Sequence, residues 1–204
     1  MELPVSVVTR KLPSISPNVN VYYPVIVHLQ DNGLQSKMNH AIVEQLNSIL
    51  MEQHYYDKNL QELIAYYELK TNERGILSLN LIVYSFTGGA HGMTIVRSLT
   101  FDTKTGIQYS LRELFQEDSD YVGVLSSLLQ EQIEQQKVQL LDPPFKTIRP
   151  DQDFYIADTS LVIYFQLYEI TPYYWGFPYF PISIKDLENI IDPDGPLNRM
   201  NSFI

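Results

Sequence analysis

Three strand-like runs joined by short connections constrain the fold of this chain more than any other feature. The runs cover residues 62–70, 76–86 and 94–101, and each is rich in β-branched or aromatic residues. Connections this short can join only antiparallel neighbours, because parallel strands need a long crossover. The segment therefore predicts an antiparallel meander, with Gly75 and Gly106 in tight turns.

The connection between the second and third runs reads Thr87-Gly88-Gly89-Ala90-His91-Gly92. Its glycines can adopt positive φ and let the backbone approach a ligand or a neighbouring segment closely. Gly88, Gly89 and His91 are therefore candidate binding residues. The alternative is a structural turn in which His91 bonds a neighbouring backbone group. A single histidine does not predict a metal site, because zinc normally takes three or four protein ligands.

Two amphipathic helices interrupt the strands. The first is predicted over residues 34–53, because an apolar stripe recurs at steps of three or four residues: Leu34, Met38, Ile42, Leu46, Ile49 and Leu50. The second is predicted over residues 120–136. Asp31 or Asn32 is the expected cap of the first helix, and Ser119 or Asp118 that of the second.

The remaining elements are short and mostly extended. We predict strands over 5–11, 21–29 and 107–110, a hairpin from 154–156 and 161–167, a last strand over 180–184, a helical turn at 111–115, and a closing helix over 185–191. The order of elements predicts an α+β fold, in which two amphipathic helices pack on a mostly antiparallel sheet. We divide it into residues 1–92 and 93–191, joined as one compact unit, followed by a flexible tail at 192–204.

Composition excludes several classes of function. The net charge of −10 disfavours binding to nucleic acid or to anionic lipid, both of which need clustered Lys and Arg. The absence of cysteine excludes disulfides and thiolate metal sites. No apolar run is long enough for a membrane span, and the N-terminal residues do not predict a signal peptide.

Aromatic residues are dense in the segment 164–180, which holds nine of them. Neighbouring strand residues point to opposite faces, so some of these side chains must be buried. Four others lie in or beside a loop between Leu167 and Pro178 and are candidate contacts, because loop aromatics often anchor interfaces and also stack on sugar rings: Tyr168, Tyr173, Tyr174 and Trp175. The alternative is that they only cover an open end of the sheet. Glu169 is a candidate either as a residue that fixes this loop or as a buried carboxylate.

Three segments together resemble a known bacterial family. They cover residues 86–92, then 99–106 with 111–115, and then 154–156, 161–165, 168–170, 172–173 and 176–178. Their order and spacing are similar to the extracytoplasmic domain of RsiV-type anti-sigma factors and to the non-catalytic N-terminal region of PdaC-type peptidoglycan deacetylases. The resemblance implies an extracytoplasmic binding module, and its best-understood members bind lysozyme. No sigma-binding segment or membrane helix is found in this sequence, and no lysozyme-binding residue is carried over by a local motif.

Motifs for catalysis are weak throughout the chain. Thr100-Phe101-Asp102-Thr103 resembles a deacetylase string but lacks its second aspartate, and no paired-histidine motif accompanies it. His40 and Glu44 lie one helical turn apart without the His-Glu-x-x-His pattern of zinc peptidases. We therefore predict no catalytic residue, no metal and no cofactor.

Three interpretations of function stay open. The first is a binding module for a cationic protein such as lysozyme, or for peptidoglycan fragments. The second is a cell-wall-directed enzyme that uses His91 with a carboxylate such as Glu169. The third is an accessory domain.

Overall fold

The computed structural model describes residues 4–14 and 16–201. Over these residues it confirms the α+β class, with three α-helices and eight strands that are mostly antiparallel. The predictions for the first residues and for the last three of the tail fall outside this range. The chain forms two compact units, residues 1–108 and 109–204, and the division after Gly92 stays a prediction. That both halves join into one unit stays a prediction.

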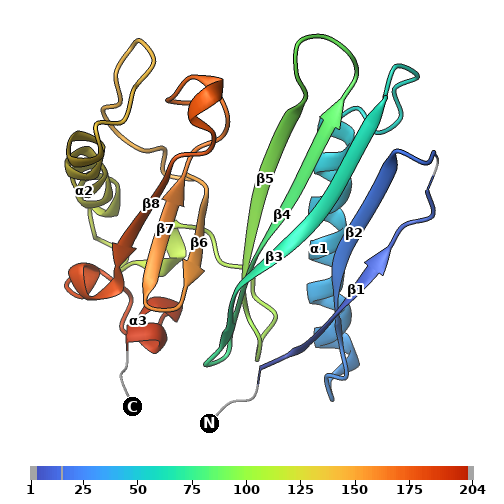
Figure 1. The fold of residues 1–204 in the computed structure, drawn as a ribbon. Helices are drawn as coiled ribbons and strands as arrows, with labels where there is room; N and C mark the ends of the chain where they lie inside the picture. The colour runs from blue at the N-terminus through green and yellow to red at the C-terminus, as the bar shows by residue number, and fades with distance from the viewer. Residues whose placement is uncertain (1–3, 15, 202–204) are drawn as a thin grey trace. The chain divides into compact units, whose positions relative to one another are not determined.

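The first unit is a five-stranded sheet with one long helix (Figure 1). Its strands are β1 (Ser6–Lys11), β2 (Val19–Val27), β3 (Glu62–Glu73), β4 (Ile76–Phe86) and β5 (Met93–Asp102). They lie in chain order, and only the β2–β3 pair is parallel. The long crossover that a parallel pair needs is supplied by α1 (Asn32–Glu52). The meander predicted for 62–101 is confirmed as β3, β4 and β5.

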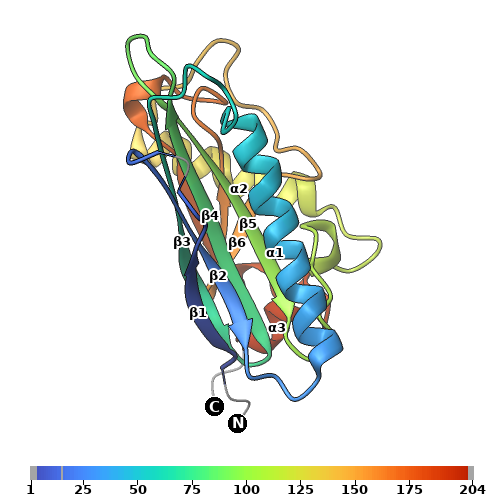
Figure 2. The same cartoon turned by 90° about the vertical axis from the view of Figure 1, so that its right-hand side faces the viewer.

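Helix α1 runs along one face of this sheet (Figure 2). The apolar stripe predicted for it is confirmed, because Met38, Ile42, Leu46, Ile49 and Leu50 are all buried. They pack with strand residues of the same face into one core, which includes Leu63, Ala65, Leu79 and Phe101. The Asp31 side chain accepts bonds from the N–H groups of Gly33 and Leu34 and so caps the helix as expected.

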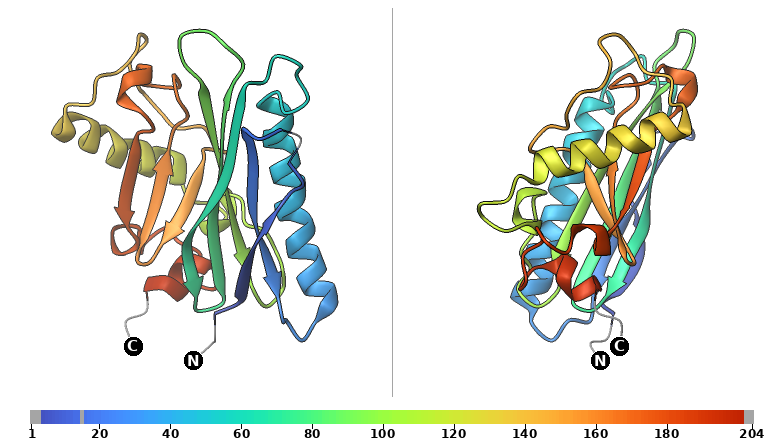
Figure 3. Two further views of the ribbon diagram at one scale, coloured as in Figure 1. Left: turned by 45° about the vertical axis from the view of Figure 1, so that its right-hand side comes forward. Right: turned by 90° about the vertical axis from the view of Figure 1, so that its left-hand side faces the viewer.

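The second unit is a three-stranded antiparallel sheet of β6 (Phe154–Ala157), β7 (Ser160–Tyr164) and β8 (Tyr179–Ser183). Helix α2 (Tyr121–Gln136) lies against β8, and Figure 3 shows it running across the sheet. The cap of α2 is Asp120 and not Ser119 or Asp118, because the Asp120 carboxylate accepts the N–H of Gly123.

Several short elements differ from the prediction. Residues 107–110 form no strand, only a single bridge between Phe101 and Gln108. The closing helix shrinks to a 3-10 turn, Ile184–Leu187. Within the expected flexible tail lies α3 (Pro196–Asn201), and its Leu197 and Met200 are fully buried. Burial of these two apolar side chains stabilises the short helix, although Pro193 and Gly195 precede it.

Candidate functional site

The glycine-rich connection forms an exposed loop between β4 and β5. Regular pairing of the two strands ends at Ser85 and Met93. Gly88 and Gly89 are exposed and adopt φ of 104° and 106°, which explains why glycine suits both positions. His91 is also exposed, and its Nδ1 lies 2.8 Å from the carbonyl oxygen of Gly92. The ring nitrogen donates to that carbonyl, as the structural alternative for this histidine expects.

Gly92 is the glycine with the strictest steric requirement in this loop. A Cβ at this position would lie 2.3 Å from Tyr84 Cε2 and 2.5 Å from the carbonyl oxygen of Ser85. We expect Gly92→Ala to lower the free energy of unfolding by about 1–3 kcal/mol, because the backbone of β4 cannot yield as a flexible side chain would. Urea unfolding measures this loss. The matched control is Gly89→Ala, whose Cβ would meet nothing within 4 Å and which pays only for its positive φ. An equal loss in both variants would contradict the steric argument.

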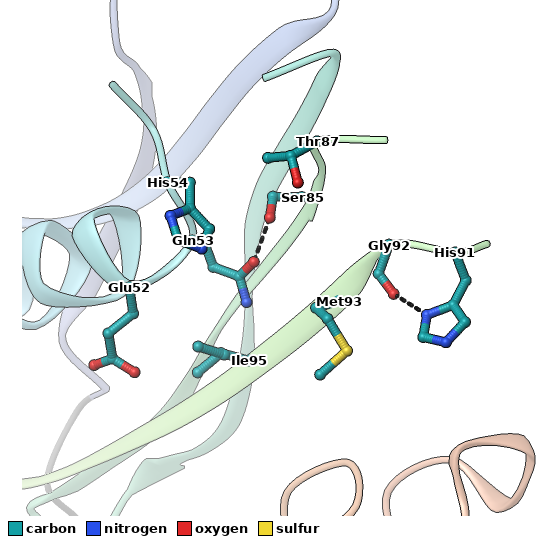
Figure 4. Close-up of a pocket in the computed structure, with 9 residues that line it drawn as sticks. All are labelled: Glu52, Gln53, His54, Ser85, Thr87, His91, Gly92, Met93 and Ile95. Atoms are coloured by element: carbon teal, nitrogen blue, oxygen red, sulfur yellow. Dashed lines mark hydrogen bonds between the residues drawn. The ribbon is translucent and has the colours of Figure 1, made fainter. Parts of the chain in front are cut away.

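Beneath this loop, the first unit has a pocket of about 270 Å³ at the C-terminal end of α1 (Figure 4). Its lining residues come from the helix end, β4, the loop and β5: Glu52, Gln53, His54, Ser85, Thr87, His91, Gly92, Met93 and Ile95. No ligand spacing in the sequence links His54 with His91. Their common feature is topological, because α1 ends beside the β4–β5 connection.

The polar groups of this pocket are held in place by neighbours. Glu52 forms an ion pair with Arg97 at 3.2 Å, and the hydroxyl of Ser85 donates to Oε1 of Gln53. Among the described residues, no group of three or more His, Asp or Glu side chains could hold a metal ion. The pocket therefore offers hydrogen-bonding groups and apolar walls rather than a metal centre.

The aromatic segment of the second unit divides into a buried part and an exposed part. Tyr164, Phe165 and Phe180 belong to the core. Tyr168, Trp175 and Tyr179 are between 38% and 48% exposed, and Tyr174 is 69% exposed. Tyr173–Trp175 form a 3-10 turn, and the rings of Tyr168 and Tyr173 lie 5.6 Å apart. We call residues 168–175 the aromatic loop.

Glu169 holds the base of the aromatic loop. One carboxylate oxygen accepts the N–H of Gln166 at 2.7 Å, and the other accepts bonds from Arg149 and from the Gln152 amide. Gln152 is buried and also donates to the Tyr164 carbonyl, which ties the network to β7. Glu169 therefore fixes the loop, one of the two roles expected for it.

The cation beside Glu169 is Arg149, twenty residues earlier in the chain and beyond the reach of any local sequence pattern. Burial acts to lower the pKa of Arg149, but Glu169, Asp151 and Asp153 act in the opposite direction and raise it overall. Arg149 is thus a permanent positive charge that neutralises Glu169. A carboxylate that is paired with an arginine and bonded to the backbone in this way acts by positioning the aromatic loop.

Charge is distributed unequally between the two units. Residues 109–204 hold 15 Asp and Glu against 6 Lys and Arg, a net charge of −9, whereas residues 1–108 hold 9 against 8. The aromatic loop thus belongs to the unit that carries nearly all of the negative charge. A net charge of this size attracts positive charges over a long range.

Comparison with known proteins gives the family context of both units. Residues 14–94 match a family model described as Deacetylase PdaC, and residues 112–185 match Protein of unknown function (DUF3298). Over 191 residues the chain is 31% identical to the anti-sigma-V factor RsiV of Bacillus subtilis. The chain is similar to this anti-sigma factor.

The chain aligns over 85% of its own length and 65% of that anti-sigma factor. It is 22% identical to the peptidoglycan-N-acetylmuramic acid deacetylase PdaC of Bacillus subtilis, over 85% of this chain and 39% of that enzyme. It therefore spans less than two thirds of either relative.

Two solved structures share the fold. They are DUF3298 family proteins from Bacteroides fragilis and Pseudomonas aeruginosa, with TM-scores of 0.74 for both and identities of 16% and 15%. Each covers 98% of this chain and is itself 98% covered. Among the described residues no helix is both long and apolar enough to cross a membrane.

Proposed function

We propose that this RsiV-like chain is a non-catalytic binding module of the bacterial cell envelope, and that it recognises a cationic protein such as lysozyme. The aromatic loop carries the proposal, because it presents exposed rings on a fixed base in the acidic unit. Rigid aromatic side chains bind with little loss of conformational entropy, and such residues dominate the energy of many interfaces. The similarity to an anti-sigma factor supports a role in recognition.

The hydrogen bonds and charge partners of His91 and Glu169 favour binding over catalysis. His91 donates to its neighbour's carbonyl, and Glu169 is neutralised by Arg149 and bonded to Gln166. A general base must be free to accept a proton from substrate, and its pKa is usually tuned for that purpose. We therefore assign contact roles to Tyr168, Tyr173, Tyr174 and Trp175, and a positioning role to Glu169. Gly88, Gly89 and His91 remain candidate contacts of the first unit.

Calorimetric titration with lysozyme at low and at physiological salt tests the proposal. We expect binding that weakens with salt yet persists at physiological ionic strength, because attraction to the acidic unit is screened but ring contacts are not. Tyr174→Ala and Trp175→Ala should each weaken binding about tenfold or more. Tyr56→Ala is the matched control, since this exposed tyrosine lies in the first unit.

The titration tests the contact surface and the identity of the partner separately. Unchanged affinity in both loop variants would remove the aromatic loop from the proposal. Absence of any binding to lysozyme would remove the partner, and peptidoglycan fragments would be titrated next.

A further inference from the structure

A buried hydroxyl without a hydrogen-bond partner lies within the aromatic loop. Thr171 is fully buried, and among the residues that the structure describes its Oγ1 has neither a donor nor an acceptor. By contrast, the hydroxyl of Thr100 is also buried but lies 2.9 Å from that of Ser78. Folded proteins pair nearly all of their buried polar atoms, so each exception needs an explanation. Any conformation of the loop that gives the Thr171 hydroxyl a partner is favoured by that bond.

The segment that holds Thr171 lies between two fixed points of the backbone. The carbonyl oxygen of Ile170 accepts an N–H from the connection after α2 at 2.8 Å, and that of Pro178 accepts the N–H of the residue after β7 at 3.2 Å. Between these points, none of the residues Tyr173–Trp175 is buried. Segments with few buried contacts have the lowest local stability in a fold. We call residues 171–176 the tip of the aromatic loop.

Gly176 provides a hinge at the end of the tip. Its backbone has φ of 78° and ψ of −151°, a region that glycine adopts and other residues almost never do. A Cβ at this position would meet no atom within 4 Å, so the need for glycine comes from the backbone alone. Glycine can also reach the extended and helical regions at little cost. Rotation about the Gly176 dihedral angles can therefore move the tip while Pro178 stays in place.

We propose that the tip is a hinged flap with two conformations, and that Thr171 is a hidden contact residue of the aromatic loop. In the closed conformation, the one described above, the hydroxyl is buried without a partner. In the open conformation the tip swings out about Gly176, and the hydroxyl bonds a polar group of the bound protein. Such a partner selects the open conformation, because a ligand shifts an equilibrium toward the state that it binds better. The flap is a property of the free chain, whereas the contact through Thr171 rests on the proposed function.

Relaxation-dispersion NMR on the free chain tests the flap without any ligand. We expect exchange between two states at the backbone amides of residues 173–176 and at the indole N–H of Trp175. Thr171→Val keeps the shape of the side chain but removes the unpaired hydroxyl, so it should lower the open population about tenfold. Gly176→Ala strains the closed conformation and should raise the open population about tenfold. Thr100→Val is the matched control, since it removes a paired hydroxyl from the first unit and should leave the exchange unchanged.

Thermal unfolding of the two valine variants shows whether the Thr171 hydroxyl lacks a partner in the closed conformation. We expect Thr171→Val to unfold at a higher temperature than the unchanged chain and Thr100→Val at a lower one, because only the second loses a hydrogen bond. A lower unfolding temperature for Thr171→Val would show that the hydroxyl is paired, as with an internal water, and would overturn the proposal. Exchange that is absent from both the unchanged chain and Gly176→Ala, or that is equal in all variants, would also overturn it.

Calorimetric titration with lysozyme tests the contact through Thr171. We expect Thr171→Val to weaken binding about tenfold, whereas Thr171→Ser retains the hydroxyl and should bind like the unchanged chain. Equal affinities of Thr171→Val and the unchanged chain would remove the contact role. Absence of lysozyme binding by the unchanged chain would overturn the proposed partner and this contact together, whereas the exchange measurements decide the flap independently.

Discussion

Replacing Glu169 with alanine is expected to weaken lysozyme binding roughly thirtyfold, more than the loss of either exposed ring, and also to destabilise the second unit. The carboxylate accepts bonds from Gln166, Arg149 and Gln152, and its side chain is only 20% exposed. Its removal takes one acceptor away from the Gln166 N–H, the Gln152 amide and Arg149, at a cost of about 2 kcal/mol in unfolding free energy. The aromatic loop then loses its fixed base, so ordering it on binding reduces affinity for every ring at once.

Asp151→Ala is the matched control for this change. Asp151 contacts the same arginine at 3.3 Å, but it is 87% exposed, and exposed ion pairs contribute little. Both variants remove one negative charge from the acidic unit, so long-range attraction falls equally. A similar loss of affinity in Asp151→Ala would show that charge explains the Glu169 effect. Equal affinities of Glu169→Ala and the unchanged protein would contradict the positioning role.

The variant Glu169→Gln separates geometry from charge. The glutamine can still accept the Gln166 N–H through its carbonyl oxygen, but it cannot neutralise Arg149. We expect an affinity between those of the unchanged protein and Glu169→Ala. Calorimetric titration gives the affinities, and thermal unfolding shows whether each variant remains folded.

Local patterns in the sequence predict the regular elements well, because neighbouring residues determine them. The stripe from Leu34 to Leu50 and the Asp31 cap are both local signals, and both are confirmed. The sequence predicts the cap of α2 one or two residues early, since Ser119, Asp118 and Asp120 are all suitable caps and only the helix register selects among them. No local pattern predicts helix α3, because burial of Leu197 stabilises it through contacts distant in sequence.

The candidate sites depend on contacts that no local pattern encodes. The partner of Glu169 lies twenty residues away on a proline-containing connection, so spacing alone could not reveal it. The pocket joins the end of α1 to the β4–β5 loop, and Gln53 is unremarkable in sequence among many glutamines. The one sequence signal for Gln53 is its position just after the apolar stripe. A helix ends there, and a helix end often leaves a polar group near a loop.

Ile42→Ala is expected to lower the free energy of unfolding by about 3–4 kcal/mol, because the side chain is fully buried between α1 and the sheet. Deleting its methyl groups leaves a cavity that a core of Leu63, Leu79 and Phe101 cannot fill by small movements. Val43→Ala is the matched control, since the adjacent Val43 is 38% exposed and should change stability by less than about 0.5 kcal/mol. Urea unfolding followed by far-ultraviolet circular dichroism measures both changes.

The same experiment tests the prediction that the two halves form one compact unit. Trp175 is the only tryptophan of the chain and lies in the second unit, so its fluorescence reports that unit alone. We expect Ile42→Ala to shift the fluorescence midpoint as much as the dichroism midpoint, because a cooperative unit loses stability as a whole. A fluorescence midpoint that stays unchanged while the dichroism midpoint falls would show that the halves unfold independently. Binding by the aromatic loop would then survive damage to the core around α1.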